Sequence, residues 1–320
     1  MLSNPLDTVT AKELFTPLSP MKASGDSLTP LSEELAGWER YQACKADAIP
    51  TGITALDRVL DGGLQDELYV LAGLPGFGKT ALALQVAESA AMKGNDVIFF
   101  SFELSKRKII SRLLSHLSYS LDTDRRLYAS QCENGYQLQG VLQDAYIRAK
   151  KAFGEVCSLL YVLDGSEPSR PAYTAKMIME TVDRFIKDTG RIPVLMVDKL
   201  QRIPRSELIG DSSVDQIEHA SYTMSLIPKF LKAPTVVLSD LTKQGELKGS
   251  SNIGHDASVV AFLKLNGLDF NAREDKRAEA LKANPRSVDL VIDKNRVGEC
   301  GIVHLDYHAP LHTFTDAKGW

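Results

Sequence analysis

The sequence predicts an α/β domain with a largely parallel, twisted sheet that is covered by helices on both faces. From Ile49 onward, short apolar runs of strand length alternate with longer amphipathic stretches of helix length, a pattern typical of sheets that are buried on both sides. A glycine-rich segment lies between the first full apolar run and the helix after it, at the sheet edge where such folds bind ligands. The helical stretches end toward the C-terminus, so we expect an antiparallel extension of the sheet there.

Eight apolar runs predict the strands. They are ELYVLAG, DVIFFSF, LLYVLDG, PVLMVD, PTVVLSD, SVVAFLKL, VDLVIDK and GIVHLDYH. The spacing of apolar residues predicts helices between the earlier runs, over TALALQVAESAAMK, KRKIISRLLSHLS, residues 136–153, TAKMIMETVDRFIKDTG and IEHASYTMSLIPKFLK. The charged segment AREDKRAEALKANPR is interpreted as a solvated insertion between two strands.

Residues 1–45 are expected to form an appendage to a domain over residues 46–320. The first 30 residues are rich in Ser, Thr and Pro, which indicates an extended arm or linker. Leu31, Leu35, Trp38 and Tyr41 then recur at helical spacing. This spacing predicts a short amphipathic helix that packs either on its own domain or on a neighbouring subunit.

The composition favours one folded domain, because 44% of the 320 residues are hydrophobic and 24% are charged. No apolar run reaches the roughly 18 residues that span a membrane, and the N-terminus lacks a signal-peptide pattern, so we expect a cytoplasmic protein without a membrane partner. The four cysteines form no CxxC pair, which favours reduced thiols over disulfides or a zinc site. With a net charge of −4, nucleic-acid binding would depend on a local basic patch.

The segment GLPGFGKT at residues 73–80 is a complete phosphate-binding loop between a predicted strand and a predicted helix. Its glycines allow backbone N–H groups to surround the phosphates of a nucleoside triphosphate. Lys79 is expected to reach the β and γ oxygens, and the Thr80 hydroxyl to ligate Mg²⁺. The predicted residues for binding ATP are Gly73, Pro75, Gly76, Phe77, Gly78, Lys79, Thr80 and Ala81.

Hydrolysis also requires a carboxylate for the metal and a base for the attacking water, and two acidic residues follow apolar runs. Asp198 ends PVLMVD, at the carboxyl edge of its strand, and is the second predicted metal ligand. Glu103 follows DVIFFSF and can align water against the γ phosphate. Either residue alone could be a helix cap or a surface charge, but their coincidence with the loop favours catalytic roles.

From about Ile49 to Phe314, the chain resembles the ATPase domain of DnaB-type replicative helicases, ring-forming members of the RecA-like superfamily. The segments that carry the resemblance are IPTGITALDRVLDGGLQ, GLPGFGKTALALQVA, SFELSKRKIISRLL, VDKLQRI, LKGSSNIGHDAS and DKNRVGECGIVHLDYHAPLHTF. The resemblance implies a RecA-like fold and a homo-oligomeric ring, most simply a hexamer, with ATP between subunits.

The resemblance also implies roles for basic residues. Lys294 and Arg296, in IDKNRVG, would reach the γ phosphate bound by the neighbouring subunit. Lys248, Gly249 and Ser251 would contact single-stranded DNA inside the ring. Without the resemblance, Lys294, Arg296 and Lys248 are typical of solvated surface positions.

The chain departs from the family pattern at particular positions. Asp240 follows the serine of the strand that senses the γ phosphate, where the family usually has glutamine. A carboxylate there repels the triphosphate unless it is protonated or turned toward a metal or a cation. Lys199 stands where an aromatic residue is frequent, and Gly249 where an acidic residue is common. Only about 45 residues stand in place of the N-terminal helical domain that docks primase in full-length relatives.

The sequence therefore predicts an ATP-dependent DNA helicase that translocates on single-stranded DNA and unwinds duplex DNA in replication. Its predicted catalytic residues are Lys79, Glu103, Asp198, Lys294 and Arg296, and primase, polymerase or a loader are candidate partners. A nucleotide-dependent loader or adaptor that does not unwind DNA is an alternative, favoured by Asp240 and the short N-terminal segment. A strand-exchange recombinase is a third interpretation, which fits the closing strands less well.

Overall fold

One mixed sheet organises the part of the chain that the structure describes. The computed structural model describes residues 47–166, 173–204, 212–249 and 252–317, together with Leu31 and Leu35. In these residues, nine strands follow the order β3-β2-β4-β5-β1-β6-β7-β8-β9. The rest of the predicted N-terminal arm and of its short helix lies outside the described residues.

The first six strands along the chain are parallel. All residues of β1, β2, β4 and β5 are buried, because helices cover both faces and each strand is a continuous apolar run. Large side chains such as Phe99, Phe100 and Met196 are fully buried, and each stabilises the fold by about 1.5–3 kcal/mol. The bounds of these strands are β1 Leu68–Gly73, β2 Val97–Ser101, β3 Leu160–Asp164, β4 Val194–Asp198, β5 Thr235–Asp240 and β6 Val259–Leu265.

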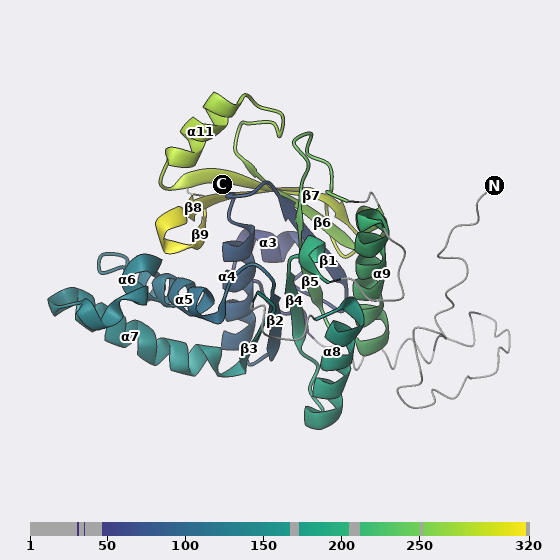
Figure 1. Ribbon diagram of the computed structural model, residues 1–320, viewed down its shortest axis with the longest axis horizontal. Helices are drawn as coiled ribbons and strands as arrows, with labels where there is room; N and C mark the ends of the chain where they lie inside the picture. Colours follow the sequence, from purple (N-terminus) through teal and green to yellow (C-terminus); the bar gives the residue numbers. More distant parts are fainter. Residues whose placement is uncertain are drawn as a thin grey trace. The chain divides into compact units, whose positions relative to one another are not determined.

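Helices cover the parallel strands on both sides. Figure 1 shows α4 and α5 on one side of β1, β2 and β4, and α8 and α9 on the other. Short helix α10 packs against α9, and short helix α3 lies near β8. The bounds are α3 Thr54–Val59, α4 Lys79–Met92, α5 Lys106–Leu121, α8 Ala175–Thr189, α9 Ser213–Leu231 and α10 Asn252–Asp256. Among the helices that the structure describes, none is both long and apolar enough to cross a membrane.

A second, smaller core lies between α5, α6 (Ala129–Glu133) and α7 (Gly140–Val156). Figure 1 shows these helices extending away from the sheet. Their shared core contains Leu114, Leu117, Leu127, Cys132, Ala145 and Ala149. This core packs α5, which begins shortly after Glu103, against α6 and α7.

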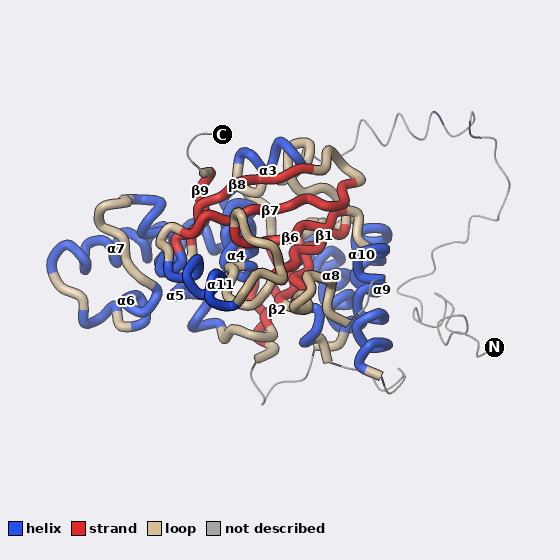
Figure 2. The backbone as a smooth tube through the Cα atoms, turned by 90° about the horizontal axis from the view of Figure 1, so that it is seen from above, coloured by secondary structure: helices blue, strands red, loops and turns tan. Residues whose placement is uncertain are grey.

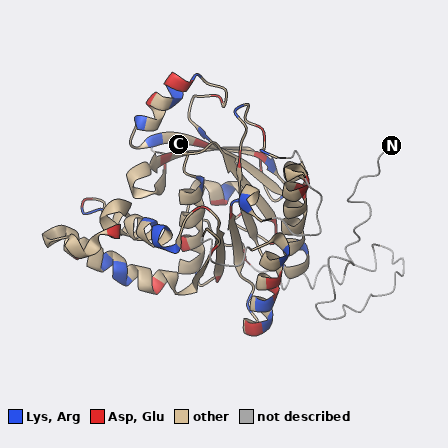
Figure 3. Ribbon diagram, viewed as in Figure 1, with Lys and Arg blue, Asp and Glu red and all other residues tan. Residues whose placement is uncertain are grey.

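The last strands form the antiparallel extension. They are β7 Arg286–Asn295, β8 Gly301–His308 and β9 Thr313–Asp316, each antiparallel to its predecessor. Seen from above, β7 and β8 lie side by side along one side of the sheet (Figure 2). Helix α11 (Glu274–Lys282) connects β6 to β7, contains no buried residue and carries both charge signs (Figure 3).

The predicted fold class is confirmed, and the differences concern short or charged elements. β9, α3, α6 and α10 were not predicted, since each has only four to six residues. The expectation that the helical stretches end toward the C-terminus was wrong, because α10 lies between β5 and β6 and α11 lies between β6 and β7. The charged insertion is exposed as expected, but it forms α11, and its last residue, Arg286, begins β7.

Candidate functional site

The predicted phosphate-binding loop, called the phosphate loop below, joins the end of β1 to the start of α4. Gly73 is the last residue of β1 and Lys79 is the first residue of α4. Gly78 precedes the helix with a left-handed φ of 102°, and none of the described side chains caps the first turn. The backbone N–H groups of that turn are therefore available to an anion. The Lys79 ammonium donates to the carbonyl oxygens of Gly73 at 2.7 Å and Leu74 at 3.3 Å, so it lies over its own loop.

Thr80 and Asp198 meet directly beside the loop. The Thr80 hydroxyl donates to Oδ2 of Asp198 at 2.8 Å, and Asp198, the last residue of β4, is only 1% exposed. Burial raises the pKa of Asp198 to about 6. Hydroxyl and carboxylate oxygens are the ligands that Mg²⁺ prefers, so this pair fits a magnesium site.

Four charged side chains form a continuous ion-pair chain next to these residues. Lys79 Nζ lies 3.2 Å from Oδ1 of Asp240. Oδ2 of the same carboxylate lies 2.5 Å from Lys199 Nζ, which in turn lies 2.7 Å from Oε1 of Glu103. The ion-pair chain therefore runs Lys79, Asp240, Lys199, Glu103, and it connects the phosphate loop to the predicted catalytic base.

The ion-pair chain explains how an acidic residue is tolerated beside the loop. Burial alone would raise the pKa of Asp240, but its hydrogen bond to Lys199 and the charge of Lys79 hold that pKa below its usual value. Burial alone would lower the pKa of Lys199, yet its hydrogen bonds to Asp240 and Glu103 raise it. Asp240 is therefore ionised, and its carboxylate faces the ammonium groups of Lys79 and Lys199. This is one of the two arrangements that reduce its repulsion of a triphosphate.

Lys294 and Arg296 lie at the end of β7 and just beyond it. Lys294 Nζ donates to backbone carbonyl oxygens of α10, at 2.7 Å to Gly254 and 3.2 Å to His255. Burial lowers the pKa of Lys294, and the nearby Arg296 lowers it further. The Arg296 side chain is exposed and makes no hydrogen bond or ion pair with any residue that the structure describes.

Strand register separates these two cations from the phosphate loop of the same chain. The backbone N–H of Arg296 donates to Ser258 at 3.0 Å, and the N–H of Ser258 donates to Leu68 at 2.9 Å. Leu68 begins β1, whereas Gly73 and the loop are at its other end. A strand of this length spans roughly 16 Å between its end residues. The structure thus does not bring Lys294 and Arg296 to the loop of their own chain.

The segment after β5 contains two of the predicted DNA-contact residues. Lys248 is exposed. Gly249 has a φ of 108°, and a Cβ atom there would lie 2.4 Å from Cδ1 of Ile217, so the backbone requires glycine. Ser251 lies outside the described residues.

Hydrogen bonds connect this segment to the end of β5. The N–H of Lys248 donates to the carbonyl of Asp240 at 2.9 Å. The Gln201 amide donates to the Lys248 carbonyl at 2.9 Å and to the Ser239 hydroxyl at 2.8 Å, and it accepts from the N–H of Asp240 at 3.2 Å. Asp240 therefore contacts the ion-pair chain through its side chain and the Lys248 segment through its backbone.

Comparison with known proteins identifies the family. Residues 48–316 match the family described as DnaB-like helicase C terminal domain. The chain belongs to this family. The replicative DNA helicase DnaB of Geobacillus stearothermophilus is 24% identical over 84% of this chain and 57% of its own length. That of Rickettsia bellii is 28% identical over 90% of this chain and 62% of its own length. The chain thus spans a little over half of these relatives.

Solved structures confirm the fold of this DnaB-family domain. One of them, described as an ATPase domain, has a TM-score of 0.72 at 20% identity, with coverage of 92% of this chain and all of that one. Another, described as a DnaB-like replicative helicase and its interactions with primase, has a TM-score of 0.71 at 21% identity. It covers 89% of this chain and 68% of that chain. The predicted RecA-like fold is therefore confirmed.

Arg286 contacts the predicted phosphate loop, a contact that the sequence interpretation missed. Its Nη1 donates to the carbonyl of Gly76 in the phosphate loop at 3.2 Å, and its guanidinium lies 5.8 Å from the ring centre of Tyr307. Tyr307 stacks on Phe314 at 4.3 Å. A Cβ atom at Gly78 would come within 3 Å of both rings. The antiparallel strands therefore pack directly against the loop, a contact between residues far apart in the sequence.

Arg112 was missed as well. It lies in α5 and lines a small pocket together with Ala81 of the phosphate-loop helix. Burial lowers the pKa of Arg112, and the charges of Asp198 and Glu103 partly counteract this effect. The sequence signal is an arginine next to the apolar positions of a predicted amphipathic helix. The structure shows that the neighbouring apolar residues Ile109 and Leu113 are buried.

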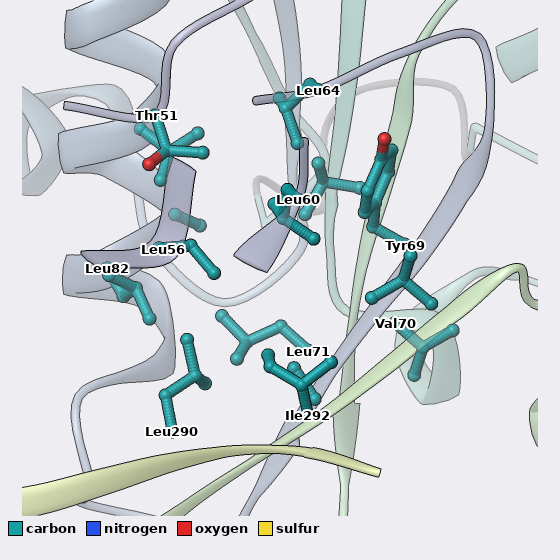
Figure 4. A pocket seen from close by; sticks show the side chains of 15 residues that line it. Thr51, Leu56, Leu60, Leu64, Tyr69, Val70, Leu71, Leu82, Leu290 and Ile292 are labelled. Carbon is teal, nitrogen blue, oxygen red and sulfur yellow. The ribbon is translucent and has the colours of Figure 1, made fainter. Parts of the chain in front are cut away.

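An apolar pocket beneath α3 does not belong to this site. Figure 4 shows Leu56, Leu60, Leu290 and Ile292 pointing toward it, with Tyr69 at its side. None of the described residues that line it carries a charge. A triphosphate needs cations and N–H groups, so the pocket does not match the ligand predicted for the phosphate loop.

Proposed function

We propose that this chain is an ATP-dependent DNA helicase of DnaB type that assembles into a homo-oligomeric ring, a hexamer. It translocates on single-stranded DNA and unwinds duplex DNA during replication. The observation that carries the proposal is the convergence of Lys79, the Thr80–Asp198 pair and Glu103 at one edge of the sheet. Family membership supports the same function, since the matched relatives are named replicative DNA helicases.

The phosphate loop and the two metal ligands would hold ATP with Mg²⁺. Gly73, Pro75, Gly76, Phe77, Gly78 and Ala81 would surround the phosphates, with Lys79 neutralising their charge. Thr80 and Asp198 provide adjacent oxygen ligands for Mg²⁺. When bound, Mg²⁺ would neutralise negative charge that develops on the phosphate oxygens.

Glu103 would orient and deprotonate the attacking water once its carboxylate is free of Lys199. Lys294 and Arg296 would complete the site from a neighbouring subunit, because their position at the far end of β1 excludes them from their own loop. An exposed arginine without a partner among the described residues suits this role. The proposed mechanism therefore requires an oligomer.

Lys248, Gly249 and Ser251 would contact the phosphates of single-stranded DNA, and repetition around a ring would compensate for the net charge of −4. Residues 1–45 would form the appendage to the ATPase domain over residues 46–320. One structural neighbour is described together with primase, so we include primase among the proposed partners, with polymerase and a loader. We place the protein in the cytoplasm.

The test combines ATP hydrolysis, with and without single-stranded DNA, and unwinding of a forked duplex. Wild type is compared with Glu103→Gln and with Glu279→Gln, a control on the exposed face of α11. We expect DNA-stimulated hydrolysis and unwinding in wild type and in the control. Glu103→Gln should lower turnover about 10²–10⁴-fold and abolish unwinding. Wild type that hydrolyses ATP but never separates strands would contradict the helicase function.

A nucleotide-dependent loader or adaptor is the second candidate. One observation favours it: Asp240 holds Lys79, and Lys199 holds Glu103, so two proposed catalytic groups are bound within the chain. A loader would bind nucleotide and DNA with little turnover and no unwinding. The same assays therefore separate the two functions.

A further inference from the structure

Lys199 and Asp240, two departures from the family pattern, are direct partners. Their side chains lie 2.5 Å apart, and both are nearly buried, at 11% and 12% exposure. The residues are 41 positions apart in the sequence, at the ends of neighbouring strands β4 and β5. Each departure alone would change the net charge beside the phosphate loop by one unit, whereas the pair leaves it unchanged.

The two residues also connect two groups that the proposed reaction needs. Asp240 directs one oxygen to Lys199 and the other to Lys79, at 3.2 Å. Lys199 contacts Asp240 and Glu103, at 2.7 Å to the latter. Each member of the pair is thus shared between its partner and one group of the proposed catalytic site.

We propose that Lys199 and Asp240 act as a paired switch that couples binding of a nucleoside triphosphate to release of Glu103. This inference rests on the proposed ATP hydrolysis. A triphosphate attracts Lys79 away from Asp240, because it carries more negative charge than one carboxylate. Asp240 then pairs with Lys199 alone, and the stronger attraction draws Lys199 away from Glu103. The freed Glu103 carboxylate can accept a proton from water. Lys199 and Asp240 are positioning residues in this scheme.

Charge balance explains why the two residues would work only together. A lysine and an aspartate carry opposite unit charges, so replacing both by neutral residues leaves the net charge of the cluster unchanged. Replacing Lys199 alone leaves Asp240 to repel the γ phosphate and to retain Lys79. Replacing Asp240 alone leaves Glu103 as the remaining partner of Lys199 in the ion-pair chain. Glu103 then stays paired with Lys199 and cannot act as the base.

A double-mutant cycle tests the switch. Lys199→Gln, Asp240→Asn and the double variant are compared with wild type by titration of a non-hydrolysable ATP analogue and of ADP, both with Mg²⁺, and by steady-state hydrolysis. Lys199→Gln should weaken analogue binding on the order of 30-fold, the effect of truncating one partner of a buried charge pair, and ADP binding much less. Asp240→Asn should retain analogue binding but lose turnover. The double variant should recover both properties to within about threefold of wild type, since its losses are not additive.

The controls separate this switch from a general loss of structure. Lys199→Arg keeps the charge and should bind the analogue like wild type, which covers the case in which Lys199→Gln does not fold. The exposed pair Lys187 and Asp183, 2.7 Å apart on α8, should show no coupling when neutralised singly and together. Additive losses in the double variant, or equal losses for ADP and the analogue, would overturn the switch. Because coupling is read from binding, it is measured even if wild type fails to unwind DNA or to turn over ATP.

Discussion

The parallel and antiparallel parts of the sheet differ in how they present Asp198, Asp240 and Arg296. In the parallel part, Asp198 and Asp240 end fully buried strands, and each contacts another polar side chain of the same site. In the antiparallel part, burial alternates along β8, and Arg296 after β7 is exposed. The parallel part therefore contains a site whose groups are already paired, whereas the antiparallel part presents a cation toward solvent or toward another subunit.

Mixing of variants tests this contrast most strongly. Arg296→Ala should lower hydrolysis about 10³-fold or more, the effect of losing an arginine finger. Mixing it with Glu103→Gln should restore part of the activity, because each variant supplies the group that the other lacks. Steady-state ATP hydrolysis of each variant alone and of the mixture measures this rescue.

The matched control is Arg273→Ala, which removes an exposed arginine from the start of α11 and should leave hydrolysis unchanged. If the mixture is no more active than the sum of its components, Arg296 does not act across a subunit boundary. The two parts of the sheet would then not differ in the proposed way.

The second largest effect is expected at Gly78, where the antiparallel strands contact the phosphate loop. Gly78→Ala would place a Cβ atom 2.8 Å from Phe314 and 2.9 Å from Tyr307, in a residue with positive φ. We expect a loss of about 3 kcal/mol in the free energy of unfolding together with weaker nucleotide binding. Urea denaturation and titration with the ATP analogue measure the two changes.

Gly94→Ala is the control, because Gly94 also has a positive φ, of 86°, but no atom lies within 4 Å of the added Cβ. It should cost only about 1–2 kcal/mol from the backbone conformation. Equal destabilisation by the two substitutions would show that the antiparallel strands do not constrain the loop.

The smallest predicted effect is the change with pH in the free energy of unfolding, which depends on Glu88 of α4 and His116 of α5. Glu88 is 3% exposed, and burial raises its pKa to about 8, while burial lowers the pKa of His116 to about 4. The folded state therefore holds the Glu88 proton more tightly than the unfolded state, and this stabilisation is lost as pH rises toward 8. The contribution of His116 is mostly present above its ordinary pKa of 6.5, so it rises only slightly between pH 6.5 and 8. We expect the free energy of unfolding to fall by about 1.5 kcal/mol between pH 6.5 and 8.

Urea denaturation at the two pH values measures this fall. Glu88→Gln should abolish it, whereas the exposed Glu279→Gln should retain it. A fall of the same size in Glu88→Gln would assign the pH dependence to another group.

The sequence predicts the long, regular elements because their signals are local. β8 matches its predicted run of residues, and α4 differs from prediction by one residue at each end, since apolar periodicity and a glycine-rich turn define them. α9 begins earlier than predicted, at Ser213, because the Ser212 hydroxyl accepts from the N–H groups of Val214 and Asp215. The short strand β9 has only four residues and depends on pairing with β8.

The residues of the candidate site could be predicted when they lie in a recognisable motif or at the end of a predicted strand. Lys79, Thr80, Asp198 and Glu103 could be named in this way, and the structure brings them together through direct or shared contacts. The partnership of Lys199 with Asp240 could not be read from sequence, because it depends on β4 lying beside β5. Arg286 was assigned to a solvated segment for the same reason, since its contact with the loop depends on tertiary packing.

Gln201 connects the end of β5 to the segment that contains Lys248, which we propose contacts DNA. Its amide joins β5 to the Lys248 segment by hydrogen bonds at 2.8 and 2.9 Å, and Asp240 bonds directly to Lys248 at 2.9 Å. Because of these hydrogen bonds, a displacement of the Asp240 backbone would also displace Lys248. In the proposed helicase, the distance that Lys248 moves would be set by how far the end of β5 moves, and the timing of that movement by the charge on the nucleotide.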